Sequence, residues 1–225
     1  MNYSIYKLGR LVLTPFNEDE KTQIILNHKN SIGGKFILKL FEIEPIIAPT
    51  IITDEILNKR IETLINILNE CIPNIYHRFP ENIKESTVIH LRLGDVIAGT
   101  TEYEYKRRPI TSNEMKLLLD DYYNKKIDNI NTEKSNKYII AKNFFTKGSS
   151  INYDECIEKS NIYLNEIKEL VNGKHITGNN TTDIDFCSAI EAGLFVQGRG
   201  YFSQLIVMIR KKLNKPVIEI PPFAF

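Results

Sequence analysis

Cysteine is scarce in this sequence, and long apolar runs are missing. Its 225 residues include only three cysteines, Cys71, Cys156 and Cys187. Their odd number and wide spacing fit no metal site, so we expect free thiols and a reducing compartment such as the cytoplasm. No run approaches the roughly 18 apolar residues of a membrane-spanning helix, and the N-terminus lacks the apolar core of a signal peptide. We therefore expect no membrane span and no signal peptide.

An excess of either charge is also absent. The chain has 29 basic and 28 acidic residues, so a broad basic face for nucleic acid is not expected. A local basic cluster at residues 106–108 is still able to meet one phosphorylated small molecule. The first strand of the regular part lacks a following Gly-x-Gly-x-x-Gly, which leaves a dinucleotide site of the NAD kind unsupported. These absences argue against a nucleic-acid partner and against an NAD site.

From residue 86 onward, strand and helix patterns alternate regularly. The predicted strands are residues 87–91, 137–145, 174–177, 194–197 and 216–220, and the predicted helices are 112–126, 154–171, a short helix from 183, and 202–213. Such alternation indicates a parallel sheet with right-handed crossovers. We therefore predict an α/β fold with a Rossmann-like domain at residues 81–225, preceded by a reduced N-terminal α/β lobe at residues 1–80.

The N-terminal part shows one clear element. An amphipathic helix is predicted at residues 53–71, with Thr53 or Asp54 as its cap and Pro73 as its end. Weaker patterns predict short strands at residues 10–14 and 22–26 and a turn at residues 31–35.

The strand at residues 87–91 ends in a cluster of polar residues, His90-Leu91-Arg92-Leu93-Gly94-Asp95. In open α/β sheets, ligands bind at the carboxyl ends of the strands. Arg92 is a permanently charged fork of donors that suits a phosphate, and Gly94 permits a tight turn. Asp95 either caps the next segment or orients the arginine. Taken alone, the segment fits equally well a strand that runs into a turn, with Arg92 and Asp95 as a surface ion pair.

Further polar residues follow the third and fourth strands of the predicted sheet. After the third strand come Asp183 and Asp185, and after the fourth come Gly198, Arg199, Gly200, Ser203 and Gln204. A glycine turn that leads into a helix offers backbone donors and the positive end of the helix dipole. Singly, Asp183 is a helix cap and the glycines form an ordinary loop. Together with Arg92 at one edge of the sheet, they favour a site for a nucleoside diphosphate.

Two segments resemble a known family. His90-Leu91-Arg92-Leu93-Gly94-Asp95 resembles the His-x-Arg-Arg-x-Asp signature of fucosyltransferases that make α1,2-, α1,6- or protein O-linked fucose. Asp183-Ile184-Asp185-Phe186-Cys187-Ser188, followed by Phe202-Ser203-Gln204, is similar to a second segment of the same group. The resemblance implies a GT-B fold, GDP-fucose as the donor substrate, inversion at the anomeric centre, and no metal or other cofactor.

The resemblance also implies roles for single residues. His90 and Asp183 would contact the guanine. Arg92 would bind the β-phosphate and stabilise the departing diphosphate, and Ser203 and Gln204 would also hold phosphate. The physical logic agrees, because the departing diphosphate gains negative charge that a guanidinium and helix-end amides stabilise.

A general base is the remaining requirement. Transfer to a glycan or glycoconjugate hydroxyl needs a carboxylate near the attacking oxygen. The acid of the family lies a few residues beyond its motif, where this chain has Glu102 and Glu104. Glu102 is the preferred candidate, and either residue can instead be a solvated loop carboxylate.

The chain departs from the family at three positions. Leu93 replaces the second arginine of the signature, and Lys142 and Asn143 replace a pair of acids that helps to shape the nucleotide pocket. These departures leave open another donor, such as UDP-xylose, on the same frame. They also leave open a non-catalytic nucleotide- or glycan-binding module, or a different nucleotide-dependent enzyme of the Rossmann class.

Overall fold

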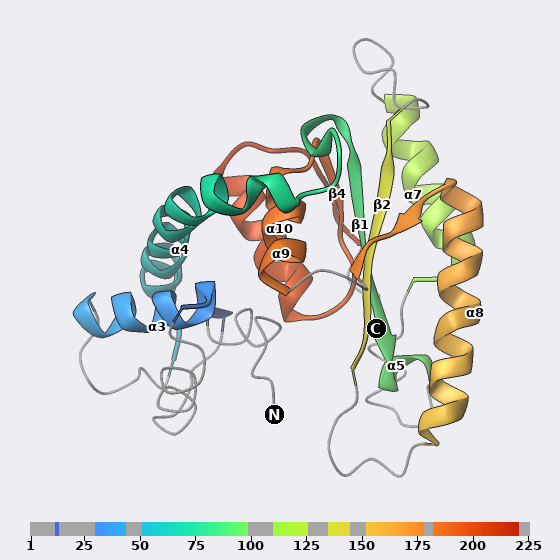
Figure 1. Ribbon diagram of the computed structural model, residues 1–225, viewed down its shortest axis with the longest axis horizontal. Coiled ribbons are helices and arrows are strands. Elements are labelled where there is room, and N and C mark those ends of the chain that lie inside the picture. Colours follow the sequence, from blue (N-terminus) through green and yellow to red (C-terminus); the bar gives the residue numbers. More distant parts are fainter. Residues whose placement is uncertain are drawn as a thin grey trace.

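Five parallel strands in the order β3-β2-β1-β4-β5 form the centre of this computed structural model (Figure 1). The structure describes residues 12–13, 30–43, 51–98, 110–125, 135–144, 152–177 and 182–220. The strands are β1 (Thr87–Gly94), β2 (Lys137–Phe144), β3 (Lys174–His175), β4 (Leu194–Val196) and β5 (Val217–Ile218). The predicted α/β fold with a Rossmann-like parallel sheet is therefore confirmed.

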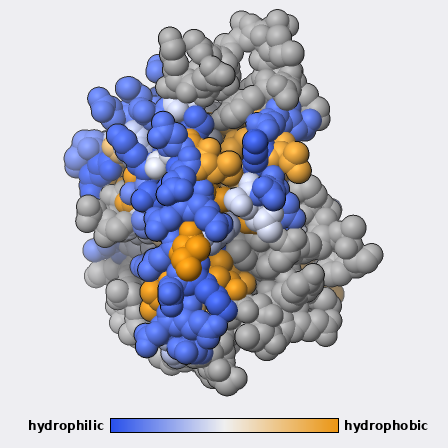
Figure 2. Space-filling model, turned by 90° about the vertical axis from the view of Figure 1, so that its right-hand side faces the viewer, coloured by the Kyte–Doolittle hydropathy of each residue, from blue (hydrophilic) through white to orange (hydrophobic). Residues whose placement is uncertain are grey.

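Helices cover both faces of the sheet (Figure 1). One face carries α7 (Ser112–Lys125) and α8 (Tyr153–Val171), and the other carries α9 (Thr182–Glu191) and α10 (Tyr201–Lys212). Outside α9 and α10 lie α4 (Asp54–Ile75) and α3 (Ile32–Ile43). Figure 2 views the molecule from the α8 side, where the described surface is largely hydrophilic with scattered apolar patches. No helix in the described ranges is long and apolar enough to cross a bilayer.

The central strand β1 divides its side chains between two cores. Val88 belongs to the core under α9 and α10, whereas Ile89, Leu91 and Leu93 belong to the core under α7 and α8. Because side chains alternate along a strand, His90 and Arg92 emerge on the same face as Val88. The register pairs Arg92 with Lys142 on β2. This alternation decides which residues of the motif face the site.

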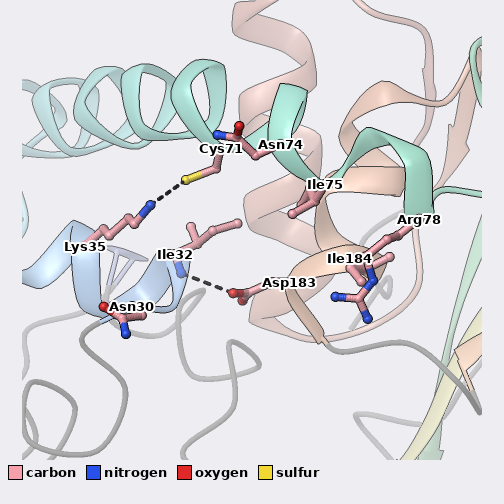
Figure 3. Close-up of a pocket in the computed structure, with 9 residues that line it drawn as sticks. All are labelled: Asn30, Ile32, Lys35, Cys71, Asn74, Ile75, Arg78, Asp183 and Ile184. Atoms are coloured by element: carbon pink, nitrogen blue, oxygen red, sulfur yellow. Dashed lines mark hydrogen bonds between the residues drawn. The ribbon is translucent and has the colours of Figure 1, made fainter.

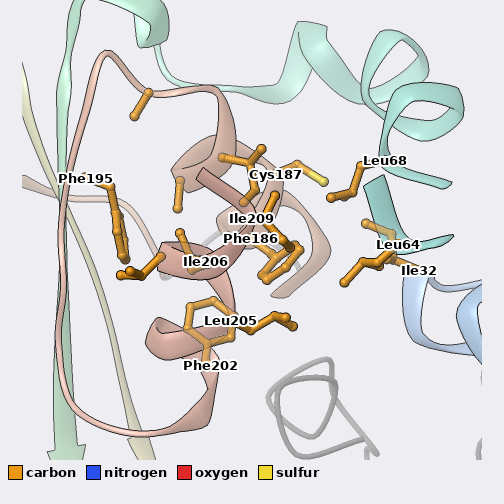
Figure 4. Close-up of a cluster of buried hydrophobic side chains, with 14 of the residues drawn as sticks. Ile32, Leu64, Leu68, Phe186, Cys187, Phe195, Phe202, Leu205, Ile206 and Ile209 are labelled. Atoms are coloured by element: carbon orange, nitrogen blue, oxygen red, sulfur yellow. The ribbon is translucent and has the colours of Figure 1, made fainter. Parts of the chain in front are cut away.

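The N-terminal helices share a core with the sheet domain. Ile32 of α3 and Leu64 and Leu68 of α4 belong to the same buried cluster as Phe186 of α9 and Leu205 of α10 (Figure 4). The described residues before residue 81 are helical or irregular, with no strand among them. The division into two domains at residue 80 stays a prediction.

Two predictions for the first 50 residues need correction. Residues 12–13 are helical, not part of a strand. The predicted turn at residues 31–35 is the start of α3, because Ser31 Oγ and Asp183 Oδ2 accept the amides of Gly34 and Ile32 at 3.1 and 3.2 Å. These acceptors satisfy first-turn donors that have no partner within the helix. The predicted strand at residues 22–26 lies outside the described residues.

Pro73 does not end α4, which continues to Ile75 with the proline in its last turn. The predicted cap Thr53 is confirmed, since its Oγ1 accepts the amide of Ile56. Thr111 caps α7, because Thr111 and Glu114 exchange amide-to-side-chain hydrogen bonds in a capping box.

A fully buried arginine on α10 joins three segments behind the sheet edge. The Arg210 guanidinium donates to the carbonyls of Ala189, Ile190 and Ala192 at 2.8–3.0 Å and to that of Pro216 at 2.7 Å. Burial lowers its pKa to about 10, while nearby Glu191 acts in the opposite direction. Arg210 thus stays charged at neutral pH and neutralises the carbonyl end of α9.

We expect Arg210→Leu to lower the free energy of unfolding by about 3 kcal/mol or more, because several buried carbonyls lose a charged donor. Urea denaturation measures the change. The matched control is Lys211→Leu, which removes only an exposed ion pair with Glu219 and should cost less than about 1 kcal/mol. Equal losses in the two variants would show that the Arg210 contacts are energetically unimportant.

Candidate functional site

The sheet has a topological switch point between β1 and β4. The chain leaves β1 toward β2 and β3, and it leaves β4 toward β5 on the other side. Ligands of open α/β sheets bind in the crevice at the carboxyl ends of such a strand pair. The residues there are those of the His90–Asp95 motif at the carboxyl end of β1 and residues 197–200 after β4. The structure therefore brings together the two segments that the sequence singled out.

The glycine turn after β4 fits closely against β1. A Cβ atom at Gly198 would lie closer than 3.0 Å to both Nδ1 and the carbonyl oxygen of His90, so only glycine fits. Gly200 has φ +94°, and a Cβ there would lie 3.2 Å from Nη1 of Arg92. The Arg92 guanidinium thus lies beside the residue that precedes α10. Gly200 offers no side-chain cap to that helix.

Ser203 and Gln204 occupy the first turn of α10 in different environments. The Ser203 hydroxyl is buried and accepts the Gly198 amide at 2.7 Å, which fixes the shape of the turn. Gln204 is exposed, and its backbone amide donates to the carbonyl of Gly200, the residue before α10. Arg199 lies between the two glycines and is half-buried. Of the predicted phosphate contacts on α10, Gln204 has the accessible side chain.

His90 lies beneath this turn. It is 5% exposed, and its ring centroid is 5.0 Å from that of Phe202 on α10. Burial, followed by the charge of Arg92, lowers the pKa of His90 from 6.5 to about 3. Its Nδ1 has no hydrogen-bond partner within the described part of the chain. The imidazole is therefore neutral at physiological pH.

The two aspartates of α9 differ in position. Asp183 is half-buried and faces a pocket of about 190 Å³, where its carboxylate accepts the Ile32 amide (Figure 3). In the same pocket Lys35 Nζ lies 3.3 Å from the sulfur of Cys71. The pocket is lined by Asn30, Ile32, Lys35, Cys71, Asn74, Ile75, Arg78, Asp183 and Ile184. Asp185 is 1% exposed within α9. Asp183 thus connects the N-terminal helices to the carboxyl edge of the sheet.

Leu93 stands where the motif that this segment resembles has its second arginine. Its side chain is 3% exposed and packs in the core under α7 and α8, on the face opposite to Arg92. Asn143, its register partner on β2, shares that face. A side chain at residue 93 therefore points away from the turn that carries Gly200, so the substitution by leucine removes no cation from that side of the sheet.

Other predicted residues are less fully described. Glu102 and Glu104 lie outside the described residues, as do residues 106–108. Asp95 is the first residue of the short helix α5 (Asp95–Ala98), and only its backbone is described. Among the described residues, no group of three or more His, Cys, Asp and Glu side chains is arranged to hold a metal ion.

Two features of this edge are not apparent from the sequence. The bond from the Ile32 amide to Asp183 joins residues 151 positions apart, and no local signal marks it. Lys142 is the register partner of Arg92. That pairing depends on the register of the two strands, which a single sequence does not display.

Comparisons with known proteins add little. The sequence matches no family model, and no curated protein matches it significantly. A solved structure that resembles it is the apo crystal form of POFUT1, a protein O-fucosyltransferase, with 13% identity and a TM-score of 0.35. The match covers 68% of this chain and 45% of that one, so it spans less than half of that protein.

The neutral state of His90 predicts a pH dependence. Unfolded His90 takes up a proton below its ordinary pKa of 6.5, whereas folded His90 stays neutral down to about pH 3. The unfolded state thus binds more protons between these values, and stability falls as the pH decreases. From about pH 7 to about pH 5 this contributes a loss of about 2 kcal/mol.

Urea denaturation of His90→Gln at both pH values tests this prediction. The variant should lose about 2 kcal/mol less than the wild type over the same interval, whatever its absolute stability. If the two proteins lose the same free energy of unfolding, His90 is already able to accept a proton in the folded state.

Proposed function

We propose that the protein is an inverting, metal-independent glycosyltransferase of the fucosyltransferase-like, GT-B class. The observation that carries the proposal is the place of Arg92 at the switch point, next to Gly200 and the start of α10. A guanidinium and the first amides of a helix converge there on one side of the sheet. Both groups favour a diphosphate.

The proposed chemistry requires stabilisation of a leaving group. The bond between the anomeric carbon of the sugar and the diphosphate oxygen breaks, and the electron pair goes to the diphosphate. Arg92 and the α10 amides stabilise that charge through interactions that strengthen as it develops. Because a guanidinium and helix-end amides supply the positive charge, the mechanism does not require a divalent cation for this step.

The acceptor hydroxyl attacks the opposite face of the anomeric carbon, which inverts its configuration. A carboxylate takes the hydroxyl proton as the new bond forms. Glu102 is proposed for this role, with Glu104 as the alternative. Fucose from GDP-fucose is the favoured donor because of the family motif, and a UDP-sugar such as UDP-xylose is the second choice.

The nucleobase contacts are also proposals. His90 is buried beneath the glycine turn, so its direct contribution to base binding requires the ligand to reach the edge of its ring. Asp183 accepts the Ile32 amide through Oδ2, and a carboxylate can accept several hydrogen bonds. Asp183 is therefore the stronger candidate for reading a base.

A second candidate function is a non-catalytic nucleotide- or glycan-binding module. The replacement of the family acids by Lys142 and Asn143 favours it. Slow hydrolysis of a bound donor distinguishes the two, since a transferase can pass the sugar to water whereas a binding module releases the donor intact.

We expect thermal stabilisation by GDP, UDP and their sugar conjugates, with none by NAD, ATP or S-adenosylmethionine, because ligands that bind only the folded state raise its melting temperature. Stabilisation only by the second group would favour a different Rossmann-class enzyme.

Transfer or donor hydrolysis should persist in EDTA. A requirement for added Mg²⁺ would contradict the metal-independent mechanism.

Arg92→Ala should lower transfer or donor hydrolysis by about 100-fold or more while the protein stays folded. Arg92→Lys should also be impaired, because an ammonium cannot present two parallel donors. Turnover is measured by product release, and folding by the melting temperature. The control is Lys159→Ala, which breaks an exposed pair with Glu155 on α8. Near-normal turnover in either Arg92 variant would refute the assigned phosphate site.

Glu102→Gln should lower transfer by about 100-fold while nucleotide binding is retained, because an amide cannot accept the hydroxyl proton. Glu104→Gln is the matched comparison. The variant that loses turnover without losing nucleotide-induced stabilisation identifies the base. If both retain turnover, neither carboxylate is the general base.

A further inference from the structure

Lys142 lies beside Arg92 at the carboxyl edge of the sheet. The register of β1 and β2 pairs the two residues directly, and their strands are parallel. Neighbouring strands lie about 4.8 Å apart, and residues in register emerge on the same face. Two cationic side chains therefore leave adjacent strands side by side.

The face that they share is the one that carries the proposed site. Ile140, two residues before Lys142, packs in the same core as Val88 on β1 and Phe202 on α10. Lys142 consequently emerges on the α10 side, as Arg92 does. It is exposed, whereas Ile140 is 2% exposed. Its charge is thus presented at the end of the strand, beyond the core.

The adjacent charges suit a particular ligand. Like charges on adjacent strands repel each other, and the repulsion grows where solvent is excluded. An anion with charge on two neighbouring groups offsets this repulsion better than an anion with one. Arginine offers a planar fork to one phosphate, and lysine offers a point charge on a flexible stem to the next.

We propose that Lys142 is a second phosphate-binding residue, which makes the site selective for a diphosphate over a monophosphate. The inference rests on the proposed function, and it adds to that site a second cation for the diphosphate of the donor. In this arrangement Arg92 holds one phosphate and Lys142 the other. Lys142 stands where the family motif has an acid, so a positive charge replaces a negative one at this position.

Inorganic pyrophosphate and inorganic phosphate are the probes, since they test the charge preference without a base or a sugar. Binding is measured by calorimetry at constant ionic strength. The wild type should bind pyrophosphate at least about tenfold more tightly than phosphate. Lys142→Ala should weaken pyrophosphate binding about tenfold and change phosphate binding much less. Lys142→Glu should weaken pyrophosphate binding further.

Lys137→Ala is the matched control. Lys137 lies on the same strand at its amino end, opposite Thr87, so it has the same charge and the wrong position. It should leave both affinities unchanged. Equal weakening by Lys137→Ala and Lys142→Ala would overturn the inference, as would an unchanged pyrophosphate-to-phosphate ratio in Lys142→Ala.

The same measurements separate this inference from the proposed function. If pyrophosphate binding depends on Lys142 but no nucleotide sugar is hydrolysed or transferred, the diphosphate site stands and the transferase does not. If Arg92→Ala abolishes turnover while Lys142→Ala leaves pyrophosphate selectivity intact, the transferase stands and the role of Lys142 is refuted. No measurable binding of pyrophosphate to the wild type would refute the role of Lys142 as well.

Discussion

The close fit of Gly198 against His90 is the contact on which the geometry of this edge depends. A side chain at residue 198 would force β1 and the turn after β4 apart. Ser203 holds the same turn from α10 through the Gly198 amide, and Phe202 packs on the His90 ring. The neutral imidazole fills the space without adding a further positive charge next to Arg92. The guanidinium and the start of α10 are therefore held together by packing as well as by charge.

The sheet could be predicted from the sequence because its signal is local. The bounds of β1, β2, α8 and α10 agree with the apolar periodicity to within three residues. The polar residues at the carboxyl end of β1 and the glycine turn after β4 lie together, as expected for neighbouring parallel strands. The start of α3 could not be predicted, since its Gly33-Gly34 pair resembles a turn unless Asp183 supplies an acceptor from the other end of the chain. The burial of His90 and the pairing of Lys142 with Arg92 depend on strand register, which a single sequence does not display.

Leu93 and Lys142, two residues at which the chain differs from the motif that it resembles, lie on opposite faces of the sheet. Leu93 lies in the core under α7 and α8, so it reports on packing. Lys142 lies on the face of Arg92, so its charge is on the side of the proposed site. The effect of a residue change within a strand motif thus depends on which face of the sheet the residue occupies. Here the residue that faces the proposed site is Lys142 and not Leu93.

Arg210 has a consequence for local opening of the chain. Its guanidinium bonds to the end of α9, to the residues before β4 and to Pro216 before β5. None of these segments can separate from the others without breaking the shared contacts, so they unfold as one cooperative unit. The glycine turn begins directly after β4 and leads into the helix that carries Arg210. We therefore expect the amide hydrogens of β4 and α10 to exchange slowly, with the turn anchored at both ends to this unit.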